Sequence, residues 1–149
     1  MTESLEKLEQ RIQHLENLME IHQLFIDYGR ALDDGDLDRY VSLFSIEGQL
    51  DLGPIGHARG HEEIRQVMAR ALDGLVGSSY HLITSPQVVL HGNTAEASVM
   101  WTVIHRDSEG QPRITMIGKH TDQLIREQGR WCIAIRRGSI DIPHRYQSP

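Results

Sequence analysis

Apolar residues in the first half of the chain recur at helical spacing and predict three helices. The longest predicted helix covers residues 3–32. Its leading half carries an apolar stripe, spaced alternately by three and four residues, that consists of Leu5, Leu8, Ile12, Leu15 and Met19. The stripe spans about two heptads, fewer than the three or four that define a coiled coil. It predicts a helix that packs on its own domain or on a neighbouring subunit.

The trailing half of this helix has a second apolar face, rotated from the first, that consists of Leu18, Ile21, Leu24, Phe25, Tyr28 and Leu32. The rotation indicates either a kink near residues 14–20 or a change of packing partner. Gly35 suits a helix C-cap, and Asp36 suits the N-cap of a second helix from Leu37 to Phe44. A third helix is predicted from about residue 61 to 75, with acidic residues in its first turn that favour the helix dipole.

A period of two, typical of strands, dominates the chain from residue 79 onward. The predicted strands are 46–52, 80–91, 95–106, 113–126 and 131–140. Segment 80–91 contains Ser85-Pro86 and is either a strand pair or one bent strand, because proline cannot donate to a central ladder. Gly92-Asn93 predicts a two-residue hairpin turn. Helices followed by a meander define a single α+β domain over residues 1–149, with residues 1–20 as an N-terminal helical extension.

Charge and cysteine content exclude several classes of function. The 149 residues carry a formal net charge of −6, which argues against a nucleic-acid surface. The single cysteine, Cys132, can form neither an intrachain disulfide nor a cysteine-based zinc site. No apolar run approaches the roughly 20 residues of a membrane span, and the polar N-terminus is unlike a signal peptide. We expect a cytoplasmic homo-oligomer, a dimer or a trimer, that binds a small molecule and neither nucleic acid nor membrane.

Three polar residues form the main candidate site. Tyr28 lies on the predicted buried face of the first helix, so its hydroxyl needs a partner. Asp33 follows the last apolar position, where the helix dipole disfavours a carboxylate. His81 lies on a predicted strand. If Asp33 and His81 meet in a pocket, the acid orients the imidazole as a base; the alternatives are turn chemistry for Asp33 and a structural role for His81.

The other histidines give weaker signals. His105 shares a strand face with Trp101 and Val103 and is a candidate for the pocket mouth, with solvent exposure as the alternative. His120 alternates with Gly118 and Asp122 and is a further pocket candidate. His57, His61 and Glu62 also suggest a metal site, but they straddle a loop and the start of a helix. We interpret them as solvated loop residues and expect no metal site.

Several short motifs together resemble the SnoaL-like family, in the superfamily of nuclear transport factor two and scytalone dehydratase. They are the run Asp27 to Asp33, Gly35-Asp36, Leu43-Phe44, His81 with Ser85-Pro86, Gly118-x-x-Thr121-Asp122, and Gly129-Arg130-Trp131 leading into Arg136. The resemblance covers roughly residues 12–140. It implies a cone-shaped, curved, antiparallel or mixed sheet wrapped around three N-terminal helices, with an internal pocket and no cofactor.

Within this family the chain resembles the elimination enzymes bile-acid 7α-dehydratase and hexachlorocyclohexane dehydrochlorinase. These keep an aspartate at the end of the first helix and a histidine 48 positions later, a separation that Asp33 and His81 reproduce. The resemblance implies a cofactor-free lyase in which His81 is the base, Asp33 orients it and Tyr28 donates to the leaving group or to a carbonyl. Arg136 is similar to an arginine of the dehydrochlorinase pocket, although the adjacent Arg137 leaves that alignment open.

The predicted substrate-binding residues are Trp101, Val103, His105, His120 and Arg136. Val103 stands where the bile-acid enzyme has an acidic residue, which is a departure from a steroid-specific site. Two alternatives to the lyase stay open. One is a non-catalytic ligand-binding or subunit-type module of the same fold, and the other is an isomerase similar to the ketosteroid isomerases, which use a carboxylate base.

Overall fold

The chain forms three α-helices and six strands in a computed structural model that describes residues 2–143. The helices are α1 (Thr2–Asp34), α2 (Leu37–Ser42) and α3 (Gly60–Ala71). The strands are β1 (Phe44–Asp51), β2 (His57–Arg59), β3 (Ser79–His91), β4 (Thr94–Arg106), β5 (Pro112–Glu127) and β6 (Arg130–Ile142). A 3₁₀ turn, η1 (Gly53–Ile55), connects β1 to β2.

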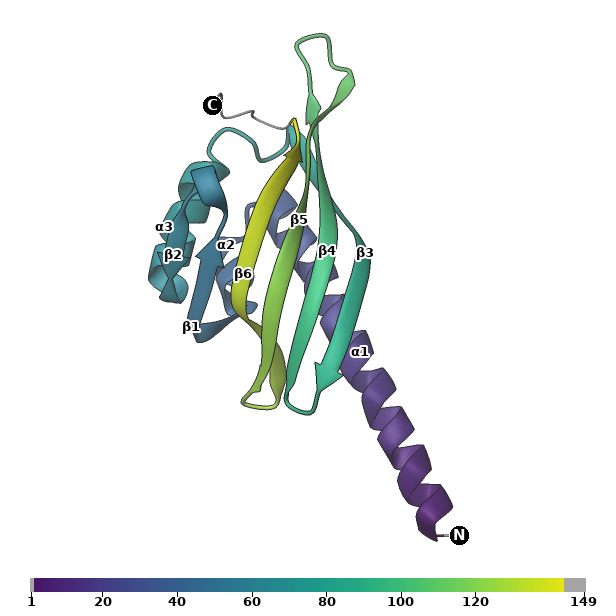
Figure 1. The fold of residues 1–149 in the computed structure, drawn as a ribbon. Coiled ribbons are helices and arrows are strands. Elements are labelled where there is room, and N and C mark those ends of the chain that lie inside the picture. Colours follow the sequence, from purple (N-terminus) through teal and green to yellow (C-terminus); the bar gives the residue numbers. More distant parts are fainter. Residues whose placement is uncertain (1, 144–149) are drawn as a thin grey trace, which may run out of the picture.

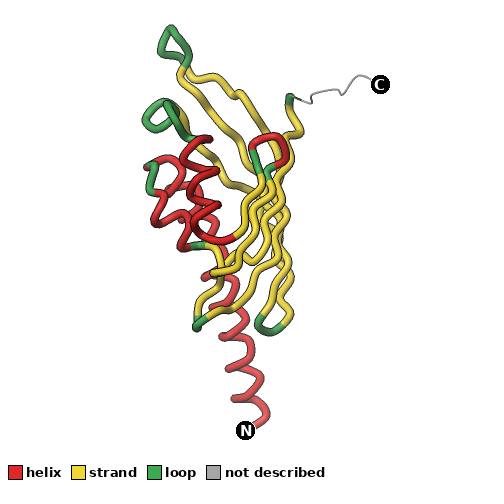
Figure 2. Tube along the Cα trace, turned by 90° about the vertical axis from the view of Figure 1, so that its left-hand side faces the viewer, coloured by secondary structure: helices red, strands yellow, loops and turns green. Residues whose placement is uncertain are grey.

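The six strands form one curved sheet in the order β2-β1-β6-β5-β4-β3. Strands β3 to β6 pair antiparallel with their neighbours in the chain, whereas β1 pairs with β6 in parallel. The helices lie on one side of this mixed sheet (Figure 2). The predicted α+β class, with a curved sheet around three helices, is therefore confirmed. No helix within residues 2–143 is long and apolar enough to cross a membrane.

Helix α1 is continuous, and its two halves have different surroundings. The trailing half packs against the sheet, and its side chains Ile21, Leu24, Phe25, Tyr28 and Leu32 are all buried. The leading half extends past the end of the sheet (Figure 1), and its apolar stripe is exposed. Of the two explanations for the rotated apolar face, the change of surroundings is the one observed. The 33 residues from Thr2 to Asp34 are assigned to a single helix.

Two helix ends differ from the sequence-based boundaries. Asp36 caps α2 as predicted, because its side chain accepts a hydrogen bond from the Arg39 backbone N–H at 3.0 Å. The helix ends at Ser42, however, and Phe44 begins β1, where it is buried opposite Ile133 of β6. Burial of Phe44 in the sheet outweighs its place in the helical pattern. Helix α3 ends at Ala71, short of the predicted residue 75.

The strands contain two irregularities that the sequence only partly indicates. Strand β3 is one bent strand at the edge of the sheet, with a shift of register between Thr84 and Gln87 and a positive φ of 53° at Ser85. Pro86 lies within this irregularity, between the paired residues Thr84 and Gln87, so the ladder needs no N–H from it. In β5 a register shift separates Ile114, which is exposed, from Met116, which faces inward. In a regular strand these two residues would share a face, and the bulge between them places them on opposite faces.

Candidate active site

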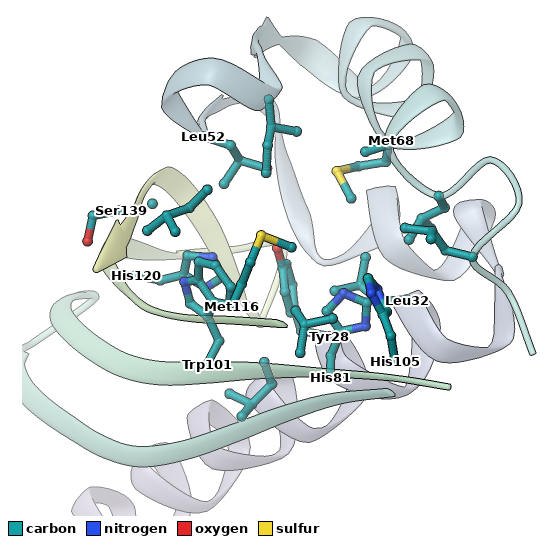
Figure 3. Close-up of a pocket in the computed structure, with 18 residues that line it drawn as sticks. Tyr28, Leu32, Leu52, Met68, His81, Trp101, His105, Met116, His120 and Ser139 are labelled. Atoms are coloured by element: carbon teal, nitrogen blue, oxygen red, sulfur yellow. The ribbon is translucent and has the colours of Figure 1, made fainter. Parts of the chain in front are cut away.

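A mainly apolar cavity of about 100 Å³ lies between the helices and the inner face of the sheet (Figure 3). Helices α1 and α3 contribute Leu32, Met68 and Ala71 to its wall. Strands β3 to β6 contribute inward-facing side chains, because alternate residues of each strand point to the same face. The polar side chains in the lining are Tyr28, His81, His105, His120 and Ser139, with the indole of Trp101 beside them.

Asp33 and His81 are in direct contact. One carboxylate oxygen of Asp33, Oδ1, accepts hydrogen bonds from the backbone N–H and from Nδ1 of His81, both at 2.8 Å. The backbone N–H is available because β3 is the edge strand of the sheet. Both bonds compensate the carboxylate for its place at the C-terminal end of α1, where the helix dipole disfavours it.

The contact fixes the protonation pattern of the His81 ring. An ionised carboxylate only accepts hydrogen bonds, so the proton of a neutral His81 ring lies on Nδ1. The second ring nitrogen, Nε2, then carries a lone pair, and His81 lines the cavity. Both side chains are largely buried, with 15% of His81 and 17% of Asp33 exposed. The arrangement is that of a base with an orienting acid beside an apolar cavity.

Tyr28 lies between the cavity and a buried ion pair. Its hydroxyl is 3.0 Å from the hydroxyl of Tyr40, within hydrogen-bond distance. Tyr40 is completely buried, and burial together with the nearby Tyr28 raises the pKa of Tyr40 well above its usual value. Tyr40 therefore stays protonated. The guanidinium carbon of Arg136 lies 4.1 Å from the centre of the Tyr28 ring, in a cation–π contact.

Arg136 does not lie in the cavity wall, where the predicted substrate-binding role would place it. Its side chain is 0% exposed, is not among the residues that line the cavity, and donates from Nε and Nη2 to the two oxygens of Asp122 at 2.7 and 2.6 Å. Burial by itself would lower the pKa of Arg136, but the charge and hydrogen bonds of Asp122 outweigh it and the pKa is raised. The prediction that Arg136 lines the pocket is wrong: the apolar core supplies no water, so the guanidinium pairs with a carboxylate behind Tyr28.

The other four predicted substrate-binding residues, Trp101, Val103, His105 and His120, all line the cavity. Trp101 stacks on His120 with ring centres 5.8 Å apart. Two glycines leave room for these rings: a Cβ on Gly118 would lie 2.5 Å from Trp101, and one on Gly138 would lie 3.1 Å from His120. Within residues 2–143, the buried atoms Trp101 Nε1, His105 Nε2 and His120 Nδ1 have no protein partner.

His120 is neutral at physiological pH. Burial is the largest cause of its lowered pKa, which lies well below 6.5, and the charge of Arg136 and the nearby His81 lower it further. In the unfolded chain the same residue takes up a proton near pH 6.5. The folded state does not bind that proton, so this group destabilises the fold progressively as the pH falls below 6.5.

We therefore expect His120→Gln to reduce the acid sensitivity of the fold. Between pH 7 and about pH 5, the wild type should lose up to about 1.4 kcal/mol of unfolding free energy per pH unit through His120, and the variant should lack this part. Urea unfolding at several pH values measures the difference. His14→Gln, at an exposed position off the apolar stripe of α1, is the matched control and should follow the wild type. Parallel pH profiles for wild type and His120→Gln would contradict the assignment.

Sequence reasoning missed Tyr40 and the pairing of Asp122 with Arg136. A signal for the pair was present, because Asp122 alternates with His120 and Leu124 on the buried face of β5. A charged residue on a buried face requires a partner of opposite charge. No group of three or more His, Cys, Asp or Glu side chains suited to hold a metal ion occurs in the part of the chain that the structure describes.

The comparisons with known proteins agree with this fold. Residues 13–137 match the SnoaL-like domain, so the chain belongs to the SnoaL-like family. An NTF2-like protein with a cystatin-like fold from Novosphingobium aromaticivorans superposes with a TM-score of 0.87 at 22% identity, covering 94% of this chain and 92% of that one. No match was found among curated proteins.

Two further solved structures carry the names of elimination enzymes. A hexachlorocyclohexane dehydrochlorinase is similar with a TM-score of 0.78 at 16% identity, covering 88% of this chain and 89% of its own. A candidate scytalone dehydratase from Novosphingobium aromaticivorans is similar with a TM-score of 0.75 at 18% identity, and each chain is covered to 87%. At these identities the likeness establishes the shared fold.

Proposed function

We propose that this protein is a cofactor-free lyase that catalyses elimination from a small, mostly apolar molecule. The observation that carries the proposal is the 2.8 Å hydrogen bond between Asp33 and Nδ1 of His81 at the wall of an apolar cavity. A carboxylate in this position stabilises the imidazolium that forms when Nε2 accepts a proton. The elimination enzymes among the structural neighbours raise the expectation of this chemistry and do not establish it.

The proposed step is the removal of a proton and a leaving group from adjacent carbons. His81 Nε2 takes the proton from carbon, and the electron pair of that C–H bond forms the new double bond. The leaving group departs with the electrons of its own bond, as hydroxide or halide. Hydroxide is neutralised by a proton from the imidazolium or from Tyr28, so that the products are an alkene and water. Apolar walls exclude competing water from the reacting carbons.

The cavity constrains the class of substrate. Pockets for drug-sized ligands enclose about 300–1,000 Å³, whereas this cavity encloses about 100 Å³. We therefore favour a substrate with one ring or a short branched chain over a four-ring steroid. The buried ring nitrogens of Trp101 and His120, which have no protein partner within residues 2–143, favour at least one polar substituent on it.

An isomerase with a carboxylate base is the less favoured reaction. That chemistry needs a carboxylate that faces the substrate. Asp33 is bonded through Oδ1 to the backbone and the ring of His81, and neither Asp33 nor Asp122 is part of the cavity lining. Among the polar lining residues, the arrangement around His81 supports a histidine base.

Thermal-shift screening followed by product analysis tests the proposal. Small cyclic and branched alcohols, hydroxyketones and alkyl halides are screened as stabilising ligands, and each hit is incubated with the protein and analysed by mass spectrometry. We expect stabilising compounds that lose water or hydrogen halide to give an alkene. If the wild-type protein binds these compounds but returns them unchanged, the result would instead support the non-catalytic ligand-binding module.

Replacing Tyr28 by phenylalanine separates a chemical role of its hydroxyl from a structural one. Tyr28 and Tyr40 share one hydrogen bond, but only Tyr28 lines the cavity. Both Tyr28→Phe and Tyr40→Phe should therefore lose about 1 kcal/mol of unfolding free energy. If Tyr28 protonates the leaving group, Tyr28→Phe should also lower kcat by about 10²-fold, whereas Tyr40→Phe should retain near wild-type kcat. Equal kcat values for the two variants would remove Tyr28 from the proposed chemistry.

A further inference from the structure

The leading half of α1 carries apolar side chains that its own domain leaves uncovered. Leu5, Leu8, Ile12, Leu15 and Met19 are between 47% and 71% exposed, and Ile26, further along the helix, is 50% exposed. This part of the helix extends beyond the sheet (Figure 1). Isolated exposed apolar residues are ordinary on a protein surface, but a continuous apolar stripe marks an interaction surface.

The exposed stripe lies on the side of α1 opposite to the side that packs on the sheet. With 3.6 residues per turn, Met19 lies about half a turn from the buried Ile21. Ile26 lies about half a turn from the buried Tyr28. The helix is also fixed to its domain at Asn17, whose side-chain oxygen accepts hydrogen bonds from Trp131 Nε1 at 3.1 Å and from Arg126 at 3.0 Å. The helix therefore cannot rotate to bury the exposed stripe against its own sheet.

The exposed positions follow a heptad pattern over three repeats. This is one repeat more than the two heptads that the stripe from Leu5 to Met19 spans. In coiled-coil notation, Leu5, Ile12, Met19 and Ile26 occupy position a, and Leu8, Leu15 and His22 occupy position d. All seven are exposed, and six are apolar. Isoleucine at a with leucine at d favours two parallel strands.

We propose that residues 5–26, here called the α1 arm, pair with the same residues of a second copy of this chain in a parallel, two-stranded coiled coil. The partner is a second copy because the stripe is complementary to itself, as a two-fold interface requires. This inference is independent of the proposed reaction, since the arm lies outside the cavity lining.

The charges beside the stripe favour the parallel arrangement. Arg11 at position g and Glu16 at position e are five residues apart. In a parallel pair, Arg11 faces Glu16 of the partner subunit, and symmetry repeats the contact. In an antiparallel pair, e positions face e positions, which brings Glu9 and Glu16 against the acidic residues of the second arm. Attraction in one arrangement and repulsion in the other specify the parallel pair.

Light scattering of the full chain at micromolar concentration tests the pairing. We expect twice the chain mass of 17.0 kDa for the wild type and 17.0 kDa for Leu8→Glu/Leu15→Glu. The double variant should keep its circular dichroism in the strand region, because both residues are about half exposed and outside the core. Gln10→Glu, which adds a negative charge on another face of the same helix, is the control and should stay dimeric. A wild-type monomer or trimer, or a dimer that survives in Leu8→Glu/Leu15→Glu, would overturn the proposal.

Charge exchange tests the parallel orientation. Arg11→Glu and Glu16→Arg should each raise the dimer dissociation constant roughly tenfold, because each converts two attractive contacts into two repulsive ones. The combination Arg11→Glu/Glu16→Arg should restore the wild-type constant. Sedimentation over a dilution series measures all four proteins. A combined variant that dissociates as readily as the single variants would rule out the parallel arrangement.

Discussion

His81→Ala is expected to lower kcat for the elimination by about 10²–10⁴-fold while the protein stays folded. This is the usual contribution of a positioned general base. The Asp33 carboxylate keeps its hydrogen bond to the backbone N–H at position 81, so the end of α1 and strand β3 should stay in contact in the variant. The measurement is initial rate against substrate concentration, using a compound that the ligand screen identifies, together with the melting temperature of the variant.

Asp33→Asn should lower kcat to a similar extent through a different cause. An asparagine amide can donate to Nδ1 of His81 and thereby place the imidazole proton on Nε2, which removes the base from the cavity. Because both residues serve one proton transfer, the double variant should be no slower than about the slower single variant. A folded His81→Ala protein with wild-type kcat would end the elimination proposal, and additive losses would show that the two residues act separately.

The antiparallel part of the fold could be predicted because each of its signals is local. Alternation in β4 places Val99, Trp101 and Val103 on one face without reference to any other strand. The Gly92-Asn93 turn then determines which residues of β3 and β4 face each other from His91 back to Gln87, where the register shifts. The same local reasoning placed the N-cap at Asp36.

The parallel pairing of β1 with β6 could not be predicted in this way. Leu50 lies opposite Arg136, and nothing in the sequence between them specifies that contact. The bulge that separates Ile114 from Met116 is also absent from the period-two pattern, because an inserted residue is visible only when the facing strand is known. Both features depend on how distant segments pack against each other.

The individual residues of the candidate site could be predicted, but the pairing of its charged side chains could not. The proximity of Asp33 and His81 was suggested by the resemblance to a family, since spacing along the chain does not determine contact. The orientation of Arg136 depends on Asp122, which lies on the neighbouring strand directly opposite it. Charged residues next to a predicted pocket point either into it or into the core behind it, and only the position of the partner decides between the two.

Arg136→Met is expected to lower the free energy of unfolding by about 3–5 kcal/mol. The substitution removes the partner of Asp122, whose side chain is 0% exposed, and leaves a carboxylate in the core without its two bonds from the guanidinium. It also removes the cation that lies 4.1 Å from the centre of the Tyr28 ring. Urea unfolding followed by circular dichroism measures the loss, which corresponds to roughly 10 °C in melting temperature for a domain of this size.

Two further variants separate burial of charge from loss of an ordinary ion pair. Asp122→Leu/Arg136→Met should recover most of the lost stability, because a buried pair replaced by apolar side chains leaves no unpaired charge in the core. Arg39→Met breaks a pair of equal length, 2.7 Å to Asp27, in which the side chains are 39% and 27% exposed. Water solvates the remaining Asp27 carboxylate, so this variant should lose about 1 kcal/mol or less. If Arg136→Met loses no more unfolding free energy than Arg39→Met, the result would contradict a dry ion pair behind Tyr28.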